Sequence, residues 1–339
     1  MKHEIDLKNY QIHTDLAIED LNLKNLGITN NIKDNIKITS INVDDDKAKE
    51  LQKKKGNYIT IEFKDASDYQ NIEELTNIFQ EELLKLLKIN NVKDNDSCMI
   101  IGLGNRNSTP DSLGPLVIDN ILVTNHLYLF SNIEEGFRRT YAISPGVMGE
   151  TGMETSDILN SIVKEVKPNF LIVIDSLASG SIDRLNKTIQ ITDTGINPGS
   201  GIGNNRKEIS KETLNIPVIA VGVPTILDAV TIVSDTINYI CKNYAYMKNN
   251  KNNLKNKLIP SNKINYLEEN YDLEEKEKKN LLGIIGELND EEIKELIYEV
   301  LTPIGYNLMV TPKEIDFVIK KISEVISNGI NYSLHKILR

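Results

Sequence analysis

Two acidic residues follow apolar runs, at the positions where an α/β enzyme places its reactive groups. Asp111 lies in the loop GLGNRNSTPDSLGP, residues 102–115, after the apolar run CMII, and Asp175 closes the run LIVID. A carboxylate at the end of a buried strand is costly unless it is solvated, paired or used in chemistry. Ligands of open α/β sheets bind outside the carboxyl ends of the strands, so both acids are candidate catalytic residues.

Two carboxylates that face one another divide the work of hydrolysis, because their repulsion raises one of the two pKa values. The charged acid takes a proton from water and the neutral acid polarises a carbonyl. Backbone amides near Gly104 or Gly180 are the expected donors to the oxyanion. The residues alone leave alternatives open. Asp111 could N-cap the following helix, Asp175 could cap the segment after it, and strand-end acids also bind metals or sugar hydroxyls.

Other catalytic chemistries have little support in the motifs. The histidines are His3, His13, His126 and His335, and none lies in a loop after the three central apolar runs, so a Ser-His-Asp triad has no well-placed base. Neither GLGNRN nor NPGSGIGNNR, residues 197–206, matches a dinucleotide or phosphate loop. We expect no bound cofactor and interpret 197–206 as a flexible loop near the active cleft.

The elements that must position the acids alternate between strands and helices. Apolar runs at 98–104, 169–178 and 216–224 predict strands buried on both faces. The segments between them have helical periodicity, for example at 112–128, and the alternation predicts an α/β fold with a doubly wound, mostly parallel sheet and flanking helices. Residues 58–63 predict a further strand.

The ends of the chain differ from this centre. Residues 1–50 are polar and predict an extended arm with short elements, and 71–87 predict an amphipathic helix. Residues 247–279 are rich in Asn, Lys and Glu, which is typical of a mobile excursion. Helices at 289–303 and 311–338 close the chain, the second with Thr311 as its N-cap.

Composition excludes several classes of protein. The net charge of −10 argues against a nucleic-acid-binding surface. No apolar run reaches the roughly 18 residues of a membrane span, and the N-terminus lacks the apolar core of a signal peptide. Cys98 and Cys241 lie far apart in apolar segments, as expected for the buried thiols of a cytoplasmic protein without disulfides.

Five motifs together resemble the germination protease family of spore-forming Firmicutes. They are GLGNRNSTPDSLGP, SPGVMGETGMETSDI, IDSLASGSIDRLN, TGINPGSGIGNNRKEIS and IPVIAVGVPTILDAVTI, and the resemblance extends from DLKNYQIHTDLAIE to LMVTPKEID. It implies an atypical aspartic-type endopeptidase that degrades small acid-soluble spore proteins during germination. The two proposed catalytic aspartates of the family fall on Asp111 and Asp175.

The resemblance also implies an organisation and a setting. We expect a propeptide at 1–15 and a single α/β protease domain at 16–339, made as a homotetrameric zymogen in the cytoplasm of the forespore. The implied fold is similar to that of the hydrogenase maturation proteases, whose nickel-sensing acids lie at the same two strand ends. A metal-dependent or metal-binding protease of that type is the alternative. Its site also uses a histidine after a later strand, and residues 221–229, VGVPTILDA, have none, so we expect no metal site.

The N-terminal segment contains a candidate cleavage site. Targets of the family are cut after an acidic residue and before an apolar and then a small one, and Asp15, Leu16 and Ala17 follow this order. We predict autocleavage at the Asp15–Leu16 bond, on an extended segment that lies in the cleft. The alternative is that TDLAIED begins a helix with Thr14 as its cap.

Overall fold

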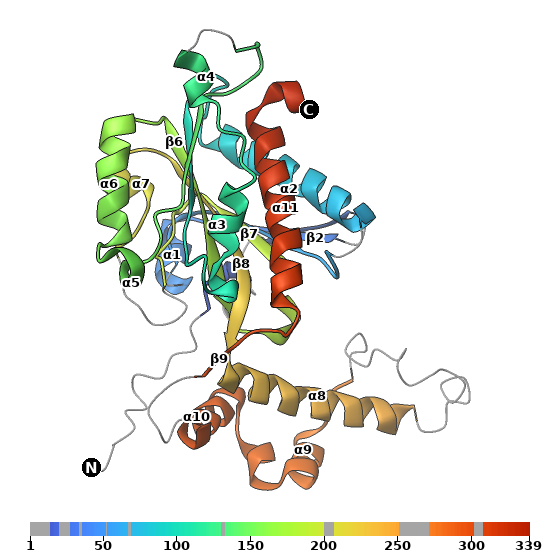
Figure 1. Cartoon of the computed structure of the whole chain (residues 1–339). Coiled ribbons are helices and arrows are strands. Elements are labelled where there is room, and N and C mark those ends of the chain that lie inside the picture. The colour runs from blue at the N-terminus through green and yellow to red at the C-terminus, as the bar shows by residue number, and fades with distance from the viewer. Residues whose placement is uncertain are drawn as a thin grey trace. The chain divides into compact units, whose positions relative to one another are not determined.

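The computed structural model describes most of the chain, which is drawn as ribbons in Figure 1. The described residues are 14–19, 28–33, 36–51, 53–66, 69–129, 133–199, 207–250, 271–301 and 308–339. Their contacts divide the chain into two compact units. The helical unit contains the described residues of Leu227–Val310, and the sheet unit contains those of His13–Ile226 and Thr311–Arg339.

A mixed β-sheet forms the frame of the fold. The described strands follow the order β1-β2-β3-β7-β8-β6-β4-β5, and β9 pairs with the end of β8. Their bounds are β1 (Ile28–Lys33), β2 (Ile36–Val43), β3 (Gly56–Glu62), β4 (Cys98–Gly102), β5 (Thr140–Ile143), β6 (Phe170–Ser179), β7 (Thr188–Thr192), β8 (Val218–Asp228) and β9 (Met309–Val310). β4 is parallel to β5 and to β6, whereas β1, β2, β3, β7 and β8 form successive antiparallel pairs.

Helices cover both faces of this sheet. The sheet unit contains α1 (Asp45–Leu51), α2 (Tyr69–Ile89), α3 (Leu113–Ile118), α4 (Asn125–Leu129), α5 (Met148–Thr151), α6 (Thr155–Val166), α7 (Lys211–Leu214) and α11 (Ile315–Leu334), and the helical unit contains α8 (Ala229–Asn249), α9 (Glu275–Leu282) and α10 (Asp290–Leu301). In Figure 1, α6 lies on one side of β6, and α2 and α11 lie on the other. The predicted α/β class with flanking helices is confirmed. The sheet is mixed rather than mostly parallel, because β1, β2, β3, β7 and β8 pair antiparallel.

The central strand β6 is buried on both faces, because successive side chains of a strand point in opposite directions. Ile172 and Ile174 belong to the large core that α2, α3 and α11 form with the sheet. Leu171 and Val173 pack on the other side, against Leu159 of α6. This two-sided burial is what a continuous apolar run predicts.

The strands that the sequence predicts are those with an apolar run or, at 58–63, an alternating pattern. Predictions at 58–63, 98–104, 169–178 and 216–224 are confirmed as β3, β4, β6 and β8. β1 and β2 lie where an extended arm is expected, and β5 and β7 are also not predicted. β7 has the sequence TIQIT, and all five of its residues are buried. Its polar side chains are buried by tertiary packing, so it gives no apolar run.

The helix predicted over 112–128 is interrupted. Its residues form the two short helices α3 and α4. Between them Thr124 is bonded to the first residue of β5: its N–H donates to the Thr140 hydroxyl at 3.1 Å, and its own hydroxyl accepts from the Thr140 N–H at 3.0 Å. These bonds to the start of β5 replace the next helical turn.

The prediction of Thr311 as a helix N-cap is wrong. Glu314 occupies the N-cap position of α11. The Thr311 hydroxyl instead donates to the Thr225 carbonyl oxygen at 2.8 Å. The hydroxyl that would cap the helix is therefore engaged in a tertiary hydrogen bond.

The segment predicted as an excursion, 247–279, is helical at both ends. α8 continues to Asn249 and α9 begins at Glu275, while residues 251–270 lie outside the described residues. The closing helices are confirmed as α10 and α11. None of the described helices combines the length and apolar character needed to cross a membrane.

His335 is a titratable side chain inside the sheet unit, directly after α11, and its exposed fraction is 0%. Its Nδ1 accepts from the Arg138 N–H at 3.2 Å, and its Nε2 lies 3.3 Å from the Leu122 carbonyl oxygen. This arrangement fits the neutral ring with its proton on Nε2. Burial lowers the pKa of His335 below its ordinary value, because the charged form is poorly solvated there.

Stability should therefore fall as the pH drops below about 6.5, the pKa of a histidine in an unfolded chain. In that range the unfolded chain binds a proton that the folded chain does not take up until the pH is lower. Urea unfolding at several pH values measures this, and His335→Gln should reduce the slope of stability against pH. Equal slopes for the two proteins would contradict the assignment.

Candidate active site

Two glycines allow helix α3 to lie directly against the end of β4. A Cβ on Gly114 would lie 2.2 Å from the Leu103 carbonyl oxygen, and one on Gly102 would lie 2.3 Å from the Gly114 carbonyl oxygen. Only glycine permits this approach of backbone to backbone. The contact fixes the start of α3 and with it the preceding 3-10 helix, Thr109–Asp111, which carries the first candidate acid.

Asp111 is held against the loop that follows β4. Its Oδ2 accepts from the Asn105 N–H at 2.9 Å. Its carbonyl oxygen would lie only 2.1 Å from a Cβ on Gly104, whose φ of +106° also favours glycine. Ser112, not Asp111, occupies the N-cap position of α3. The capping alternative for Asp111 is therefore wrong.

Asp175 lies within β6, which continues to Ser179. The residue is 6% exposed, and its Oδ1 accepts from the Ser176 N–H at 2.9 Å. Because the strand continues, Asp175 caps no helix. The alternation of side chains places it on the same face of the sheet as Val173 and Leu177, which is the face covered by α6.

The pairing of β4 with β6 brings the two acids to one edge of the sheet. The Leu103 N–H donates to the Ile174 carbonyl oxygen at 2.8 Å, so the residue before Gly104 is bonded to the residue before Asp175. Asp111 packs on Gly104. The two acids thus come from neighbouring strands, as expected, and their joint action on one water stays a prediction.

Residues 14–19 lie along the end of β6. The Asp15 N–H donates to the Ala178 carbonyl oxygen at 3.2 Å, and the Ala178 N–H donates to Asp15 Oδ2 at 2.9 Å. Leu16 is fully buried, with 0% exposed. Within the described residues 14–19, the helix considered for this segment appears as one 3-10 turn, Ala17–Glu19, which begins after the predicted cleavage bond.

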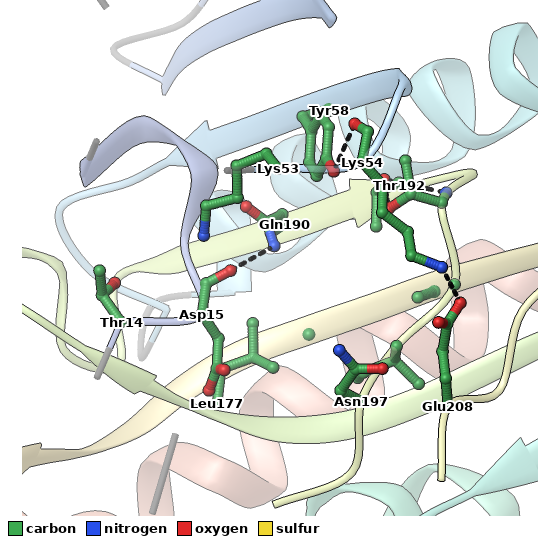
Figure 2. A pocket seen from close by; sticks show the side chains of 15 residues that line it. Thr14, Asp15, Lys53, Lys54, Tyr58, Leu177, Gln190, Thr192, Asn197 and Glu208 are labelled. Atoms are coloured by element: carbon green, nitrogen blue, oxygen red, sulfur yellow. Dashed lines mark hydrogen bonds and ion pairs between the residues drawn. The ribbon is translucent and has the colours of Figure 1, made fainter. Parts of the chain in front are cut away.

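The side-chain amide of Gln190 bonds to the peptide groups on both sides of Leu16. Its Nε2 donates to the Asp15 carbonyl oxygen at 3.1 Å, and its Oε1 accepts from the Ala17 N–H at 2.7 Å. Figure 2 shows the amide meeting the main chain of Asp15. Sequence reasoning missed Gln190, and the only available signal was a polar residue between the two isoleucines of TIQIT.

Glu19 anchors the residues that follow the predicted bond. Its carboxylate accepts from the Ser179 hydroxyl at 2.9 Å and the Gly180 N–H at 2.6 Å, lies 3.4 Å from Arg184 Nη1, and also accepts from the Thr14 hydroxyl. The side chain is 5% exposed, so this is a buried and well-paired charge. Gly180, an expected oxyanion donor, binds Glu19 with its N–H in this structure.

A pocket of about 260 Å³ opens beside Asp15. Figure 2 shows its lining, which includes Thr14, Asp15, Lys53, Lys54, Gln190 and Glu208. Lys54 forms an ion pair with Glu208. The pocket therefore presents basic side chains close to the acidic residue of the predicted cleavage site.

The described residues offer neither a metal cluster nor an activated thiol at this site. In the described part of the chain, no group of three or more His, Cys, Asp or Glu residues is placed to hold a metal ion. Cys98 and Cys241 are free thiols, and burial raises the pKa of each. A nucleophilic cysteine needs a lowered pKa, so neither thiol fits that role.

Comparison with known proteins gives matches over nearly the whole chain. The family model described as germination protease, Peptidase_A25, matches residues 4–339. Germination proteases of Bacillus cereus strain AH187 and Geobacillus sp. strain WCH70 are 45% and 44% identical to this chain, over 99% of it and 96% and 97% of their own lengths. A nickel–iron hydrogenase maturation protease of Thermococcus kodakarensis is a solved structure with a TM-score of 0.28 at 15% identity, covering 42% of this chain and 80% of that one.

These matches define first a class and then a family. The class is the aspartic-type peptidases. Within it, the chain belongs to the germination protease family. The resemblance drawn from the five sequence motifs is thereby confirmed.

Replacing Gly114 by alanine should displace α3 from β4, because the new Cβ would overlap the Leu103 carbonyl oxygen. We expect the free energy of unfolding to fall by about 1–3 kcal/mol, as for other overpacked sites. Peptidase activity should fall as well, since Asp111 moves with α3. Urea unfolding and peptide cleavage measure the two effects.

The matched control for this change is Gly149→Ala in α5. A Cβ at Gly149 would meet nothing within 4 Å, so this variant should keep both stability and activity. A Gly114→Ala protein that behaves like the Gly149→Ala protein would show that the contact of α3 with β4 does not hold Asp111.

Proposed function

We propose that this germination protease is an endopeptidase that degrades small acid-soluble spore proteins during germination and is made as a zymogen that removes its own residues 1–15. The observation that carries the proposal is the binding of the Asp15–Leu16 peptide between Ala178 and Gln190. The segment has the acidic, apolar and small residues in the order expected of a cleavage site. A spore protein with the same order would occupy the same place once residues 1–15 have left and residues 16–19 have moved out of it.

In this proposal Asp111 and Asp175 carry out hydrolysis as a pair. The charged acid removes a proton from water, and the water oxygen attacks the carbonyl carbon of Asp15. The neutral acid polarises the carbonyl and supplies a proton to the Leu16 nitrogen as the C–N bond breaks. The burial of Asp175 and the position of both acids at one sheet edge support the pairing, because both conditions favour a shared proton.

The contacts of the bound segment support selection of the residues around the cut. The Ala178 N–H donates to the Asp15 carboxylate, and hydrogen bonds to an ionised acceptor are the stronger kind. Lys53 lines the pocket beside Asp15. Leu16 is enclosed completely, which favours an apolar residue after the bond.

The family resemblance supports an assembly and a place in the cell. We propose a homotetramer of subunits whose 16–339 segment forms the protease, stored in the cytoplasm of the forespore and then in the spore core. Sedimentation of the full chain measures the mass of the assembly directly.

Replacing Asp111 or Asp175 by asparagine should reduce cleavage of a purified spore protein by about 10²–10⁴-fold, the usual contribution of a general acid or base. Asparagine keeps the shape of the side chain but neither accepts nor releases the proton. Fragments separated by mass spectrometry measure the rate. Asp119→Asn is the matched control, because Asp119 forms an exposed ion pair with Arg106, and such pairs contribute little.

The same cleavage assay, repeated with a chelator, decides between hydrolysis by the acid pair and hydrolysis by a metal ion. Full activity of an Asp175→Asn protein that keeps its assembly would remove the catalytic assignment. Cleavage that persists with a chelator supports the acid pair, whereas loss with the chelator and rescue by an added metal would favour the metal-dependent alternative.

Replacing Asp15 by alanine should slow self-processing at the Asp15–Leu16 bond by about 10–100-fold, which corresponds to the loss of one hydrogen bond to a charged group. Asp15→Asn keeps an acceptor for the Ala178 N–H and should lose less. Intact-mass measurement of the full chain over time follows the reaction. An alanine variant that matures at this bond as fast as the parent would exclude Asp15 as a recognition residue.

A further inference from the structure

We propose that Gln190 is a catalytic residue, whose side-chain amide holds the scissile carbonyl group and stabilises the oxyanion that forms on it. This inference rests on the proposed function, because it takes Asp15–Leu16 as the bond that is cut. Gln190 Nε2 lies 3.1 Å from the Asp15 carbonyl oxygen, the atom that becomes negatively charged during hydrolysis. Side-chain amides at about this distance are established donors in oxyanion holes.

A second hydrogen bond determines which way the amide faces. Gln190 Oε1 accepts from the Ala17 N–H at 2.7 Å, and only the oxygen of an amide accepts a hydrogen bond. The NH₂ group must then face the Asp15 carbonyl oxygen. Both partners are main-chain atoms, so the same two bonds can form with any peptide placed here, whatever its side chains.

Strand β7 places this amide on the face of the sheet that also carries Asp175. Gln190 is in register with Gly222 of β8. Gly222 in turn lies beneath Leu177 of β6, since a Cβ on it would lie 2.3 Å from Leu177 Cδ1. Leu177 and Asp175 are two residues apart in one strand and point to the same face. Gln190 and Asp175 therefore lie on the same face of the sheet with one strand between their own strands, and the side chain of Leu177 covers Gly222 on that strand.

Burial makes the amide depend on a bound peptide. Gln190 is 6% exposed in a strand whose residues are all buried, and a buried amide without hydrogen-bond partners destabilises the protein. Residues 15–17 supply the two bonds in this structure. When the bond is cut and residues 1–15 leave, the Asp15 carbonyl leaves with them. The donor of Gln190 is then available for the carbonyl of the next peptide.

The chemical step keeps Gln190 unchanged. As the water oxygen bonds to the carbonyl carbon, the electron pair of the C=O double bond moves to oxygen, and the Nε2–H donates to this oxyanion. Return of the electron pair breaks the C–N bond, and the Leu16 nitrogen takes its proton from the aspartate pair. Gln190 transfers no proton and acts only through its hydrogen bond.

The test follows self-processing of the full chain at the Asp15–Leu16 bond by intact mass, a reaction in which the peptide is already bound. Gln190→Leu removes both the donor and the acceptor. Gln190→Glu keeps the acceptor for the Ala17 N–H but has no donor when ionised. At neutral pH we expect both variants to react about 10²–10³-fold more slowly than the parent.

Thr188→Val is the matched control. Thr188 lies on the same strand and face as Gln190, two residues earlier, and its buried hydroxyl has no hydrogen-bond partner among the described residues. The valine variant should process at the parent rate. Thermal unfolding of every variant shows whether it is folded. If Gln190→Glu does not fold, Gln190→Leu still tests the proposal, because leucine is an apolar residue suited to a buried strand.

The pH profile separates a hydrogen-bond donor from a structural role. As the pH falls through the pKa of the introduced carboxyl, which burial raises above the ordinary value of about 4.3, Gln190→Glu regains a donor, so its rate relative to the parent should rise. The rate of Gln190→Leu relative to the parent should stay constant. Parent-like rates for both variants, or the same pH profile for both, overturn the proposal. A parent chain that is never cut at Asp15–Leu16 overturns the proposed function itself, and this is determined before any variant is compared.

Discussion

A polar group that is buried in a protein needs a hydrogen-bond partner, and this requirement organises the end of the sheet where the site lies. Asp175 and Gln190 are each 6% exposed, and the Glu19 side chain is 5% exposed. Asp175 is bonded to the next backbone N–H, Glu19 to the Gly180 N–H, and Gln190 to the main chain of residues 15–17. The N-terminal segment is therefore part of the hydrogen bonding of the sheet. Its position explains why the predicted cleavage bond is presented in a defined orientation.

The second constraint is the close contact of α3 with β4. Because Gly102 and Gly114 have no side chains, the helix backbone reaches the strand and places Asp111 on the loop after β4. β6 lies between β4, which precedes the Asp111 loop, and β8, which pairs with the strand of Gln190. The candidate acid Asp175 and the peptide-binding Gln190 thus belong to strands of one sheet, and Asp111 lies on a loop that packs against it. Such support fixes reacting groups more firmly than separate loops would.

The parts of the fold that could be predicted from the sequence are those with a strong hydrophobic pattern. β4, β6 and β8 are apolar on both faces, and α2 and α11 have apolar stripes, so periodicity identifies them. β7 could not be found, because its threonines and glutamine are buried only through contacts made elsewhere in the chain. Asp111 and Asp175 were identifiable as candidates because both lie close to the ends of apolar runs. Gln190 was not, since its partners at 15–17 are more than 170 residues away in sequence.

The sequence by itself determined the α/β class and the family and made the two acids candidates, because these depend on local patterns and on motifs of adjacent residues. It also placed an acidic, an apolar and a small residue at positions 15–17. Only the tertiary structure decided that Asp111 is not a helix cap, that Glu19 is a buried anchor and that Gln190 holds the Asp15–Leu16 peptide. The physical reason is that a hydrogen bond between distant segments depends on strand order and register, and neither property is encoded in any one stretch of the chain.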